Sequence, residues 1–135
     1  MAYLLIVDDD EDFASAATRA LKAAGYEVGV EPNISGAIAR MEGRTPDLVI
    51  LDVMFPEDSG AGFNVARSMH QDEKLKRVPV LMLTAINERF PLGFSSRDID
   101  EGWLPVSEFL EKPVDLGFLL TRVRQLLGAP AQASP

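Results

Sequence analysis

Residues 48–52 read Leu48-Val49-Ile50-Leu51-Asp52, four consecutive apolar residues followed directly by a carboxylate. A short apolar run without polar alternation is typical of a parallel strand that is covered on both faces. In open α/β sheets the carboxyl ends of the strands carry the chemistry, and Asp52 would lie at such an end. A lone Asp between a strand and a loop is also a common turn residue, so other segments must decide its role.

A second apolar run of strand length, Tyr3 to Val7, ends in five acidic residues, Asp8, Asp9, Asp10, Glu11 and Asp12. Apolar residues at helical spacing between Phe13 and Ala24, closed by Gly25, predict that a helix follows. Acids in a first turn stabilise a helix, and Asp is a good N-cap. Because capping uses one or two acids, the remaining ones indicate a further role.

The rest of the chain continues the alternation of strand and helix patterns. Between the two runs already described, we expect a strand over residues 27–30 and a short helix capped by Asn33 or Ser35 and ended by Gly43. After Asp52 we expect an irregular loop over 57–62, a helix marked by Phe63, Ala66 and Met69, and a strand from Val78 to Leu83 that ends at Thr84. Near the end of the chain we expect a brief strand at Phe109 and Leu110 before Lys112, and an amphipathic helix from Leu116 to Leu127 capped by Asp115. Pro and Gly interrupt residues 87–107, which predicts irregular structure in place of a regular fourth helix.

This alternation predicts an α/β fold, a doubly wound five-stranded parallel sheet with helices on both faces. The carboxyl ends of its strands meet at one edge. We therefore expect one group of side chains there, made of Asp8, Asp9, Asp52, Thr84 and Lys112.

Composition bounds the class of protein. A length of 135 residues fits one domain, which we place at 1–128, with 129–135 as a disordered tail or the start of a linker. A net charge of −8 argues against direct binding to nucleic acid or to an anionic membrane. Without Cys, disulfides and thiolate chemistry are excluded, and the first residues resemble neither a signal peptide nor a membrane span. We therefore expect a cytoplasmic protein with a protein or small-ligand partner.

Carboxylates gathered at one edge need a positive charge among them. Three carboxylates within about 4 to 6 Å repel by a few kcal/mol per pair at an effective dielectric constant of about 20. Mg²⁺ suits such a group, because it prefers one or two carboxylates and keeps open positions for phosphoryl oxygens. Asp52 could then act as a nucleophile toward phosphorus, with Lys112 neutralising the transferred group and the Thr84 hydroxyl donating to it.

The motifs Asp8-Asp9, Asp52, Thr84-Ala85 and Lys112-Pro113 resemble the receiver domain of two-component response regulators, over Tyr3 to about Leu127. The resemblance implies a flavodoxin-like sheet of strand order 2-1-3-4-5, with Asp52 as the phospho-acceptor. It implies a Mg²⁺ site formed by Asp8, Asp9, Asp52 and the Met54 carbonyl, with Asp8 acting mostly through water. Thr84 and Lys112 would sense the phosphate, and Phe109 would be either the aromatic switch residue or simply part of the core.

The resemblance also implies partners. A sensor histidine kinase or a phosphotransfer protein would phosphorylate Asp52, and an unknown downstream protein would bind the face made of the fourth helix, fifth strand and fifth helix. The domain would catalyse its own phosphorylation and slow dephosphorylation rather than act as a conventional enzyme. Met54 and Ile86 are apolar and cannot position an attacking water, which predicts slow hydrolysis of the phosphorylated Asp52.

The segment 87–107 is unusually aromatic. Phe90, Phe94 or Trp103 would either contribute to a partner or homodimer surface over residues 87–127 or simply cover the sheet. Two other functions remain open: a phosphorylation-independent pseudo-receiver that acts as an interaction module, and a hydrolase with an aspartyl-phosphate intermediate. The hydrolase would need a second acid two residues after Asp52, where Met54 stands. The sequence does not separate a free-standing receiver from a fragment of a multidomain regulator.

Overall fold

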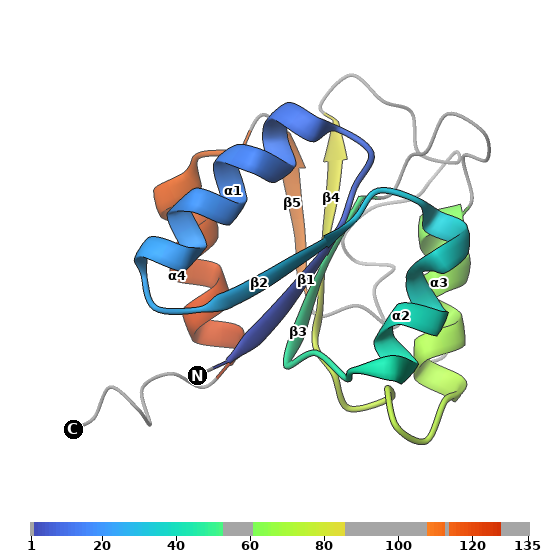
Figure 1. The fold of residues 1–135 in the computed structure, drawn as a ribbon. Helices are drawn as coiled ribbons and strands as arrows, with labels where there is room; N and C mark the ends of the chain where they lie inside the picture. Colours follow the sequence, from blue (N-terminus) through green and yellow to red (C-terminus); the bar gives the residue numbers. More distant parts are fainter. Residues whose placement is uncertain (1, 53–60, 86–107, 113, 128–135) are drawn as a thin grey trace.

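A computed structural model describes residues 2–52, 61–85, 108–112 and 114–127. Strands and helices alternate along residues 2–85, a further strand and helix follow in residues 108–127, and one sheet lies between helices (Figure 1). The elements are β1 (Tyr3–Val7), α1 (Glu11–Ala23), β2 (Glu27–Glu31), η1 (Ile34–Gly36), α2 (Ala37–Gly43), β3 (Leu48–Asp52), α3 (Ala61–Gln71), β4 (Val80–Ala85), β5 (Glu108–Lys112) and α4 (Leu116–Leu126). The predictions for the segment 87–107 and for the tail 129–135 lie outside the described residues.

The strands form a parallel sheet in the order β2-β1-β3-β4-β5. This arrangement confirms the predicted doubly wound α/β fold and its strand order. From β1 the chain first adds β2 on one side and then crosses to β3 on the other side. The sheet therefore changes its winding direction between β1 and β3.

The unbroken apolar runs are explained by helices on both faces of the sheet (Figure 1). Leu5 and Val7 of β1 point into a core beneath α2 and α3, whereas Leu4 and Ile6 point into a core beneath α1 and α4. β3 and β4 alternate in the same way. Every residue of β1 and β3 is consequently buried, which leaves no polar face along these two strands.

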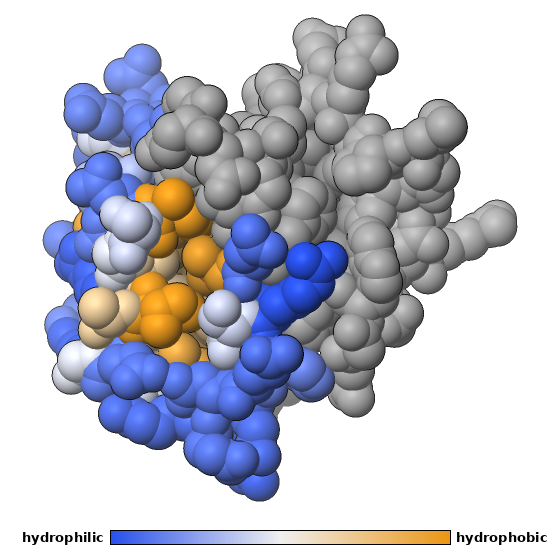
Figure 2. Space-filling view, turned by 90° about the vertical axis from the view of Figure 1, so that its right-hand side faces the viewer, coloured by the Kyte–Doolittle hydropathy of each residue, from blue (hydrophilic) through white to orange (hydrophobic). Residues whose placement is uncertain are grey.

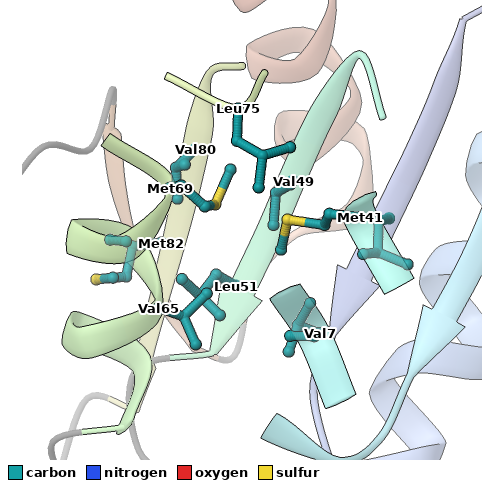
Figure 3. Close-up of a cluster of buried hydrophobic side chains, with 12 residues drawn as sticks. Val7, Met41, Val49, Leu51, Val65, Met69, Leu75, Val80 and Met82 are labelled. Carbon is teal, nitrogen blue, oxygen red and sulfur yellow. The ribbon is translucent and has the colours of Figure 1, made fainter. Parts of the chain in front are cut away.

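The core beneath α2 and α3 is filled by branched and thioether side chains. Met41 of α2 and Met69 of α3 lie over Val49 and Leu51 of the central strand β3 (Figure 3). On the outer surface of this side, apolar residues gather in one patch bordered by hydrophilic ones (Figure 2). Among the residues that the structure describes, no helix has the length and apolar character needed to cross a membrane.

Local signals set the ends of two helices as predicted. The Asp10 carboxylate accepts a hydrogen bond from the Phe13 amide at 3.1 Å and caps α1. After α1, Gly25 has φ of 102°, a left-handed conformation that glycine adopts without strain. Asp115 caps α4 in the same way as Asp10, accepting from the Phe118 amide at 2.9 Å.

Three local predictions were wrong. The fourth strand begins at Val80 rather than Val78, because the Val78 amide donates to the Leu75 carbonyl in the preceding turn at 3.0 Å. Residues 61–62 belong to α3 rather than to a loop, because packing of that helix against the core outweighs the turn propensity of glycine. Neither Asn33 nor Ser35 caps the second helix, since η1 and α2 have no side-chain cap hydrogen bond and Ser35 lies inside η1.

Candidate functional site

The site begins with the register between two neighbouring strands. Val7 of β1 pairs with Leu51 of β3, so Asp8 and Asp52 follow paired residues at the same edge of the sheet. This edge is the carboxyl end of the strands, and the two strands flank the point where the winding direction changes. Ligands of open α/β sheets bind in the crevice that forms at such a point.

Three carboxylates meet there. Asp8, Asp9 and Asp52 each offer one carboxylate oxygen, and these oxygens lie within 4.8 Å of one another. Asp8 is 1% exposed and Asp52 is 6% exposed, whereas Asp9 is exposed. The cluster therefore has two buried acids and one acid open to solvent. The convergence of these side chains follows the prediction made from the strand ends.

Backbone hydrogen bonds fix the orientation of Asp8. Its Oδ1 accepts from the Asp10 amide at 2.9 Å, and its own amide donates to the Glu31 carbonyl at 3.2 Å. The first bond closes an Asx turn, in which an Asp side chain accepts a hydrogen bond from the backbone amide two residues later. The second bond joins Asp8 to the end of β2. Sequence reasoning missed the part played by Glu31, because a backbone carbonyl leaves no signature in residue type.

The three carboxylates repel one another, and a cation that shares the cluster would offset this repulsion. At the observed spacing, two ionised carboxylates repel by roughly 3 kcal/mol for an effective dielectric constant of about 20. Burial of Asp8 and Asp52 strengthens this repulsion, since less water screens them. Oxygen donors from a few carboxylates, with one side open to solvent, fit the preference of Mg²⁺ for partial protein coordination. The residues present therefore fit a hard divalent cation.

The other predicted residues are located by their backbone only. Thr84 pairs with Glu111 and Ala85 with Lys112, so both strands extend beyond the level of Asp52 at this edge. The side chains of Thr84, Phe109 and Lys112 lie outside what the structure describes, as does the whole of Met54. Their predicted roles around the phosphoryl group stay predictions.

The comparisons with known proteins agree on one family. A family model for the response regulator receiver domain matches residues 4–124. The chain is 34% identical over 128 residues to the DNA-binding dual master transcriptional regulator RpaA of Synechocystis sp., which covers 94% of this chain and 49% of that protein. It is 32% identical to the phosphate regulon transcriptional regulatory protein PhoB of Pseudomonas aeruginosa, covering 92% of this chain and 51% of PhoB.

Solved structures give the same picture. The chemotaxis protein CheY4 of Vibrio cholerae superposes with a TM-score of 0.77 at 28% identity, covering 93% of this chain and 98% of CheY4. The chain spans about half the length of RpaA and PhoB, and the matched half contains the sheet and its acidic edge. Because the receiver model runs from β1 into α4, this chain belongs to the response regulator receiver domain family of two-component systems.

Proposed function

We propose that this receiver domain is a phosphoacceptor switch, in which Asp52 takes a phosphoryl group from a histidine kinase or a phosphotransfer protein with the help of Mg²⁺. The observation that carries the proposal is the meeting of Asp8, Asp9 and Asp52 within 4.8 Å at the carboxyl edge of the sheet. Repulsion among these carboxylates would take up part of a total stability of only about 5 to 15 kcal/mol, and bound Mg²⁺ would offset it.

Asp52 is the proposed nucleophile, because it ends the central strand β3. Its carboxylate oxygen forms a bond to phosphorus while the bond between phosphorus and the donor's histidine nitrogen breaks, and the electron pair returns to the imidazole. Asp8, Asp9, Asp52 and the Met54 carbonyl would hold Mg²⁺, which when bound neutralises charge on the phosphoryl oxygens. Asp8 serves this role in a fixed orientation, held by its bonds to Asp10 and Glu31.

The neighbouring strands supply the remaining proposed groups. The Thr84 hydroxyl would donate to a phosphoryl oxygen, and the Lys112 ammonium would neutralise the transferred group from the other side. Phe109 would change its rotamer as the Thr84 region moves. These roles are supported by the family resemblance and by the strand order, in which β4 lies beside β3 and β5 lies beside β4.

We further propose that phosphorylation alters a partner surface over residues 87–127, which includes β5 and α4. Phe118 of α4 supports this placement, because it is 51% exposed and is the exposed large apolar residue among those that the structure describes. Phe side chains bury a large apolar area in interfaces, so this ring would contribute to such a contact. The occupant would be a downstream protein or a second copy of the chain. With a net charge of −8, this domain would not contact nucleic acid directly, and we propose a cytoplasmic location.

The phosphorylated form should be long-lived. Met54 and Ile86 follow the acceptor and Thr84 by two residues, and their apolar side chains cannot hold a water for attack on the phosphorus. Met54→Asn would therefore speed the decay of the phosphorylated protein. A decay rate equal to that of the wild type would contradict this reading.

Incubation with acetyl phosphate and Mg²⁺, followed by intact mass measurement, tests the proposed function. We expect the wild type to gain one phosphoryl group, and Asp52→Asn or an excess of EDTA to abolish the gain. Asp12→Asn is a matched control, because Asp12 lies in the same acidic run but in the first turn of α1 and outside the cluster. No addition to the wild type would indicate a pseudo-receiver, and turnover of acetyl phosphate without accumulation would indicate a hydrolase.

A further inference from the structure

The acidic cluster depends on the end of an edge strand. β2 is the outermost strand of the sheet and Glu31 is its last residue. The Glu31 carbonyl nevertheless accepts the hydrogen bond from the Asp8 amide, at 3.2 Å. A strand end that is paired on one side only frays more readily than a central strand. The orientation of the buried Asp8 is therefore sensitive to whatever holds Glu31 in place.

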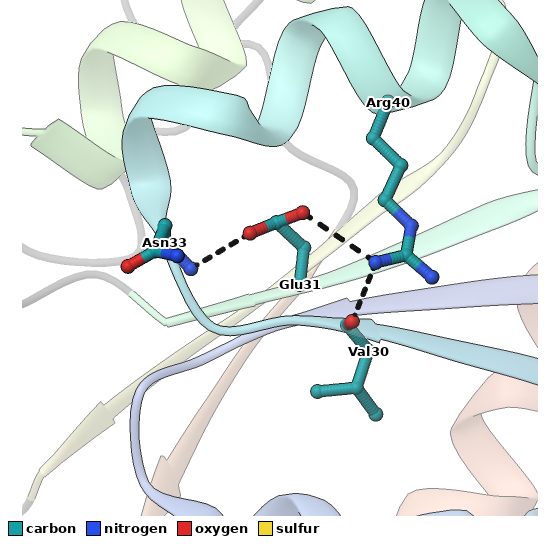
Figure 4. Close-up of polar contacts among 4 residues, drawn as sticks. All are labelled: Val30, Glu31, Asn33 and Arg40. Carbon is teal, nitrogen blue, oxygen red and sulfur yellow. Dashed lines mark hydrogen bonds and ion pairs between the residues drawn. The ribbon is translucent and has the colours of Figure 1, made fainter.

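Arg40 of α2 holds this strand end from outside. One guanidinium nitrogen, Nη1, donates to the Val30 carbonyl at 2.7 Å and lies 3.4 Å from Glu31 Oε1 (Figure 4). The other carboxylate oxygen of Glu31 accepts from the Asn33 amide at 3.0 Å. Arg40 and its neighbours thus fasten both the backbone and the side chain at the end of β2.

The Val30 carbonyl explains why an arginine is needed there. In β2, Glu27 and Glu31 direct backbone groups toward β1, since the Glu27 amide donates to the Ala2 carbonyl and the Glu31 carbonyl accepts from Asp8. Backbone groups of the intervening even-numbered residues point away from β1, toward the open edge. Arg40 satisfies one of these outward carbonyls, and so takes the place that a further strand would occupy.

We propose that Arg40 is a positioning residue for the metal site. The Arg40 guanidinium holds the end of β2, and there the Glu31 carbonyl accepts a hydrogen bond from the Asp8 amide. This bond in turn fixes the backbone that carries the Asp8 carboxylate. This inference rests on the proposed function for its consequence, namely tighter Mg²⁺ binding. The positional claim itself concerns the Asp8 hydrogen bond and holds without any cation.

The chain contains a matched control for this claim. Arg44 follows α2 and pairs with Glu27, the first residue of β2, at distances of 2.6 and 2.7 Å. The same strand thus carries an arginine–glutamate pair at each end, and only the pair of Arg40 and Glu31 adjoins Asp8. Arg44 also stacks on the Tyr3 ring at 4.0 Å, so removing it disturbs the protein at least as much.

The experiment compares the wild type with Arg40→Ala and Arg44→Ala, all unphosphorylated. Amide hydrogen exchange followed by NMR reports the Asp8 hydrogen bond, and calorimetric titration with Mg²⁺ reports affinity. We expect Arg40→Ala to speed exchange of the Asp8 amide and to raise the dissociation constant for Mg²⁺ by about 3- to 10-fold, somewhat less than the loss of a residue that contacts a metal ligand directly. Arg44→Ala should leave both quantities within about twofold of the wild type.

The outcomes separate the two proposals. Unchanged Asp8 exchange in Arg40→Ala would overturn the positioning role, whatever happens to Mg²⁺. Equal changes in Arg40→Ala and Arg44→Ala would also overturn it, because they would reflect general loosening of β2. If the wild type bound no Mg²⁺, the proposed function would fail, while faster Asp8 exchange in Arg40→Ala alone would still support the positioning role.

Discussion

Arg44 holds Glu27 by two hydrogen bonds, with Nη1 2.6 Å from Oε2 and Nη2 2.7 Å from Oε1. The pair joins the end of α2 to the start of the edge strand β2. The hydrogen bond from Arg44 lowers the pKa of Glu27 below its ordinary value of 4.5. Because folding favours the ionised form of Glu27, the pair makes stability depend on pH.

The sign of this dependence is fixed by the lowered pKa. The contribution of Glu27 is fully present above its pKa in the unfolded chain and is lost as the pH falls through the lower pKa of the folded protein. We expect Glu27→Gln to be less stable than the wild type at neutral pH, with a gap that closes in acid below 4.5. Urea unfolding of both proteins over a pH series measures the gap. A gap that stays constant or widens in acid would show that the pair does not act through this ionisation.

Gly29 leaves room for the Tyr3 ring beside β2. A Cβ atom at residue 29 would lie 2.9 Å from Tyr3 Oη and 3.1 Å from an Arg40 nitrogen. Because Tyr3 is 8% exposed and stacked under Arg44, the ring has little freedom to move. We expect Gly29→Ala to lower the free energy of unfolding by about 1 to 3 kcal/mol.

The control for this crowding is Gly43→Ala, since a Cβ there would meet nothing within 4 Å. This variant should be neutral or more stable by up to about 1 kcal/mol, as alanine favours helix over glycine. Denaturant unfolding compares both variants with the wild type. Equal effects of the two substitutions would rule out crowding at residue 29 as the cause.

Asp10 links the acidic turn to α1. Its carboxylate caps the helix, and its amide donates to Asp8 Oδ1 at 2.9 Å. We expect Asp10→Ala to lower the free energy of unfolding by about 1 kcal/mol. Asp10→Asn should keep most of the stabilisation by the cap, because Asn also caps helices. Asp115→Ala removes the corresponding cap of α4 and should cost a similar amount. Weaker Mg²⁺ binding should accompany Asp10→Ala but not Asp115→Ala. Loss of the Asp10 cap loosens the turn whose backbone amide bonds the Asp8 carboxylate, whereas Asp115 is not bonded to Asp8. Calorimetry shows whether the two caps differ in this respect.

Repulsion within the cluster predicts that removing one charge stabilises the protein when cations are absent. In EDTA, Asp9→Asn should raise the free energy of unfolding by about 1 kcal/mol or less, a modest gain because water screens the exposed Asp9. Asp12→Asn should do the opposite, since Asp12 favours the start of α1. With Mg²⁺ added, the wild type should gain more stability than Asp9→Asn. A loss of stability in Asp9→Asn in EDTA would contradict the repulsion.

The central strands could be predicted because helices on both faces leave a continuous apolar run. The edge strand β2 gave a weaker pattern, since two glutamates occupy one of its faces. Glu31 pairs with Arg40 of α2, and Glu27 pairs with Arg44 directly after α2. Val78 is apolar like its successors, and only the hydrogen bond of its amide within a turn excludes it from β4. Local residue type does not encode that choice.

The acidic cluster could be predicted from the rule that parallel strands end at one edge. The sequence could not give the pairing of Val7 with Leu51, which brings Asp8 and Asp52 to the same level. It also could not give the contact between Glu31 and Asp8, because any residue supplies a carbonyl. The roles at the site stay predictions for Met54, Thr84, Phe109 and Lys112.

Binding of Mn²⁺ in place of Mg²⁺, followed by NMR, tests most directly whether the cluster is a cation site. A paramagnetic ion broadens the amide signals of the residues around it. We predict that small amounts of Mn²⁺ broaden the signals of residues 7–10 and 51–52, that excess Mg²⁺ restores them, and that Asp52→Asn abolishes the effect. Broadening centred instead on Glu42 and Asp72, whose carboxyl groups lie beside each other, would contradict a divalent cation site at the carboxyl edge of the sheet. The absence of any broadening would contradict it as well.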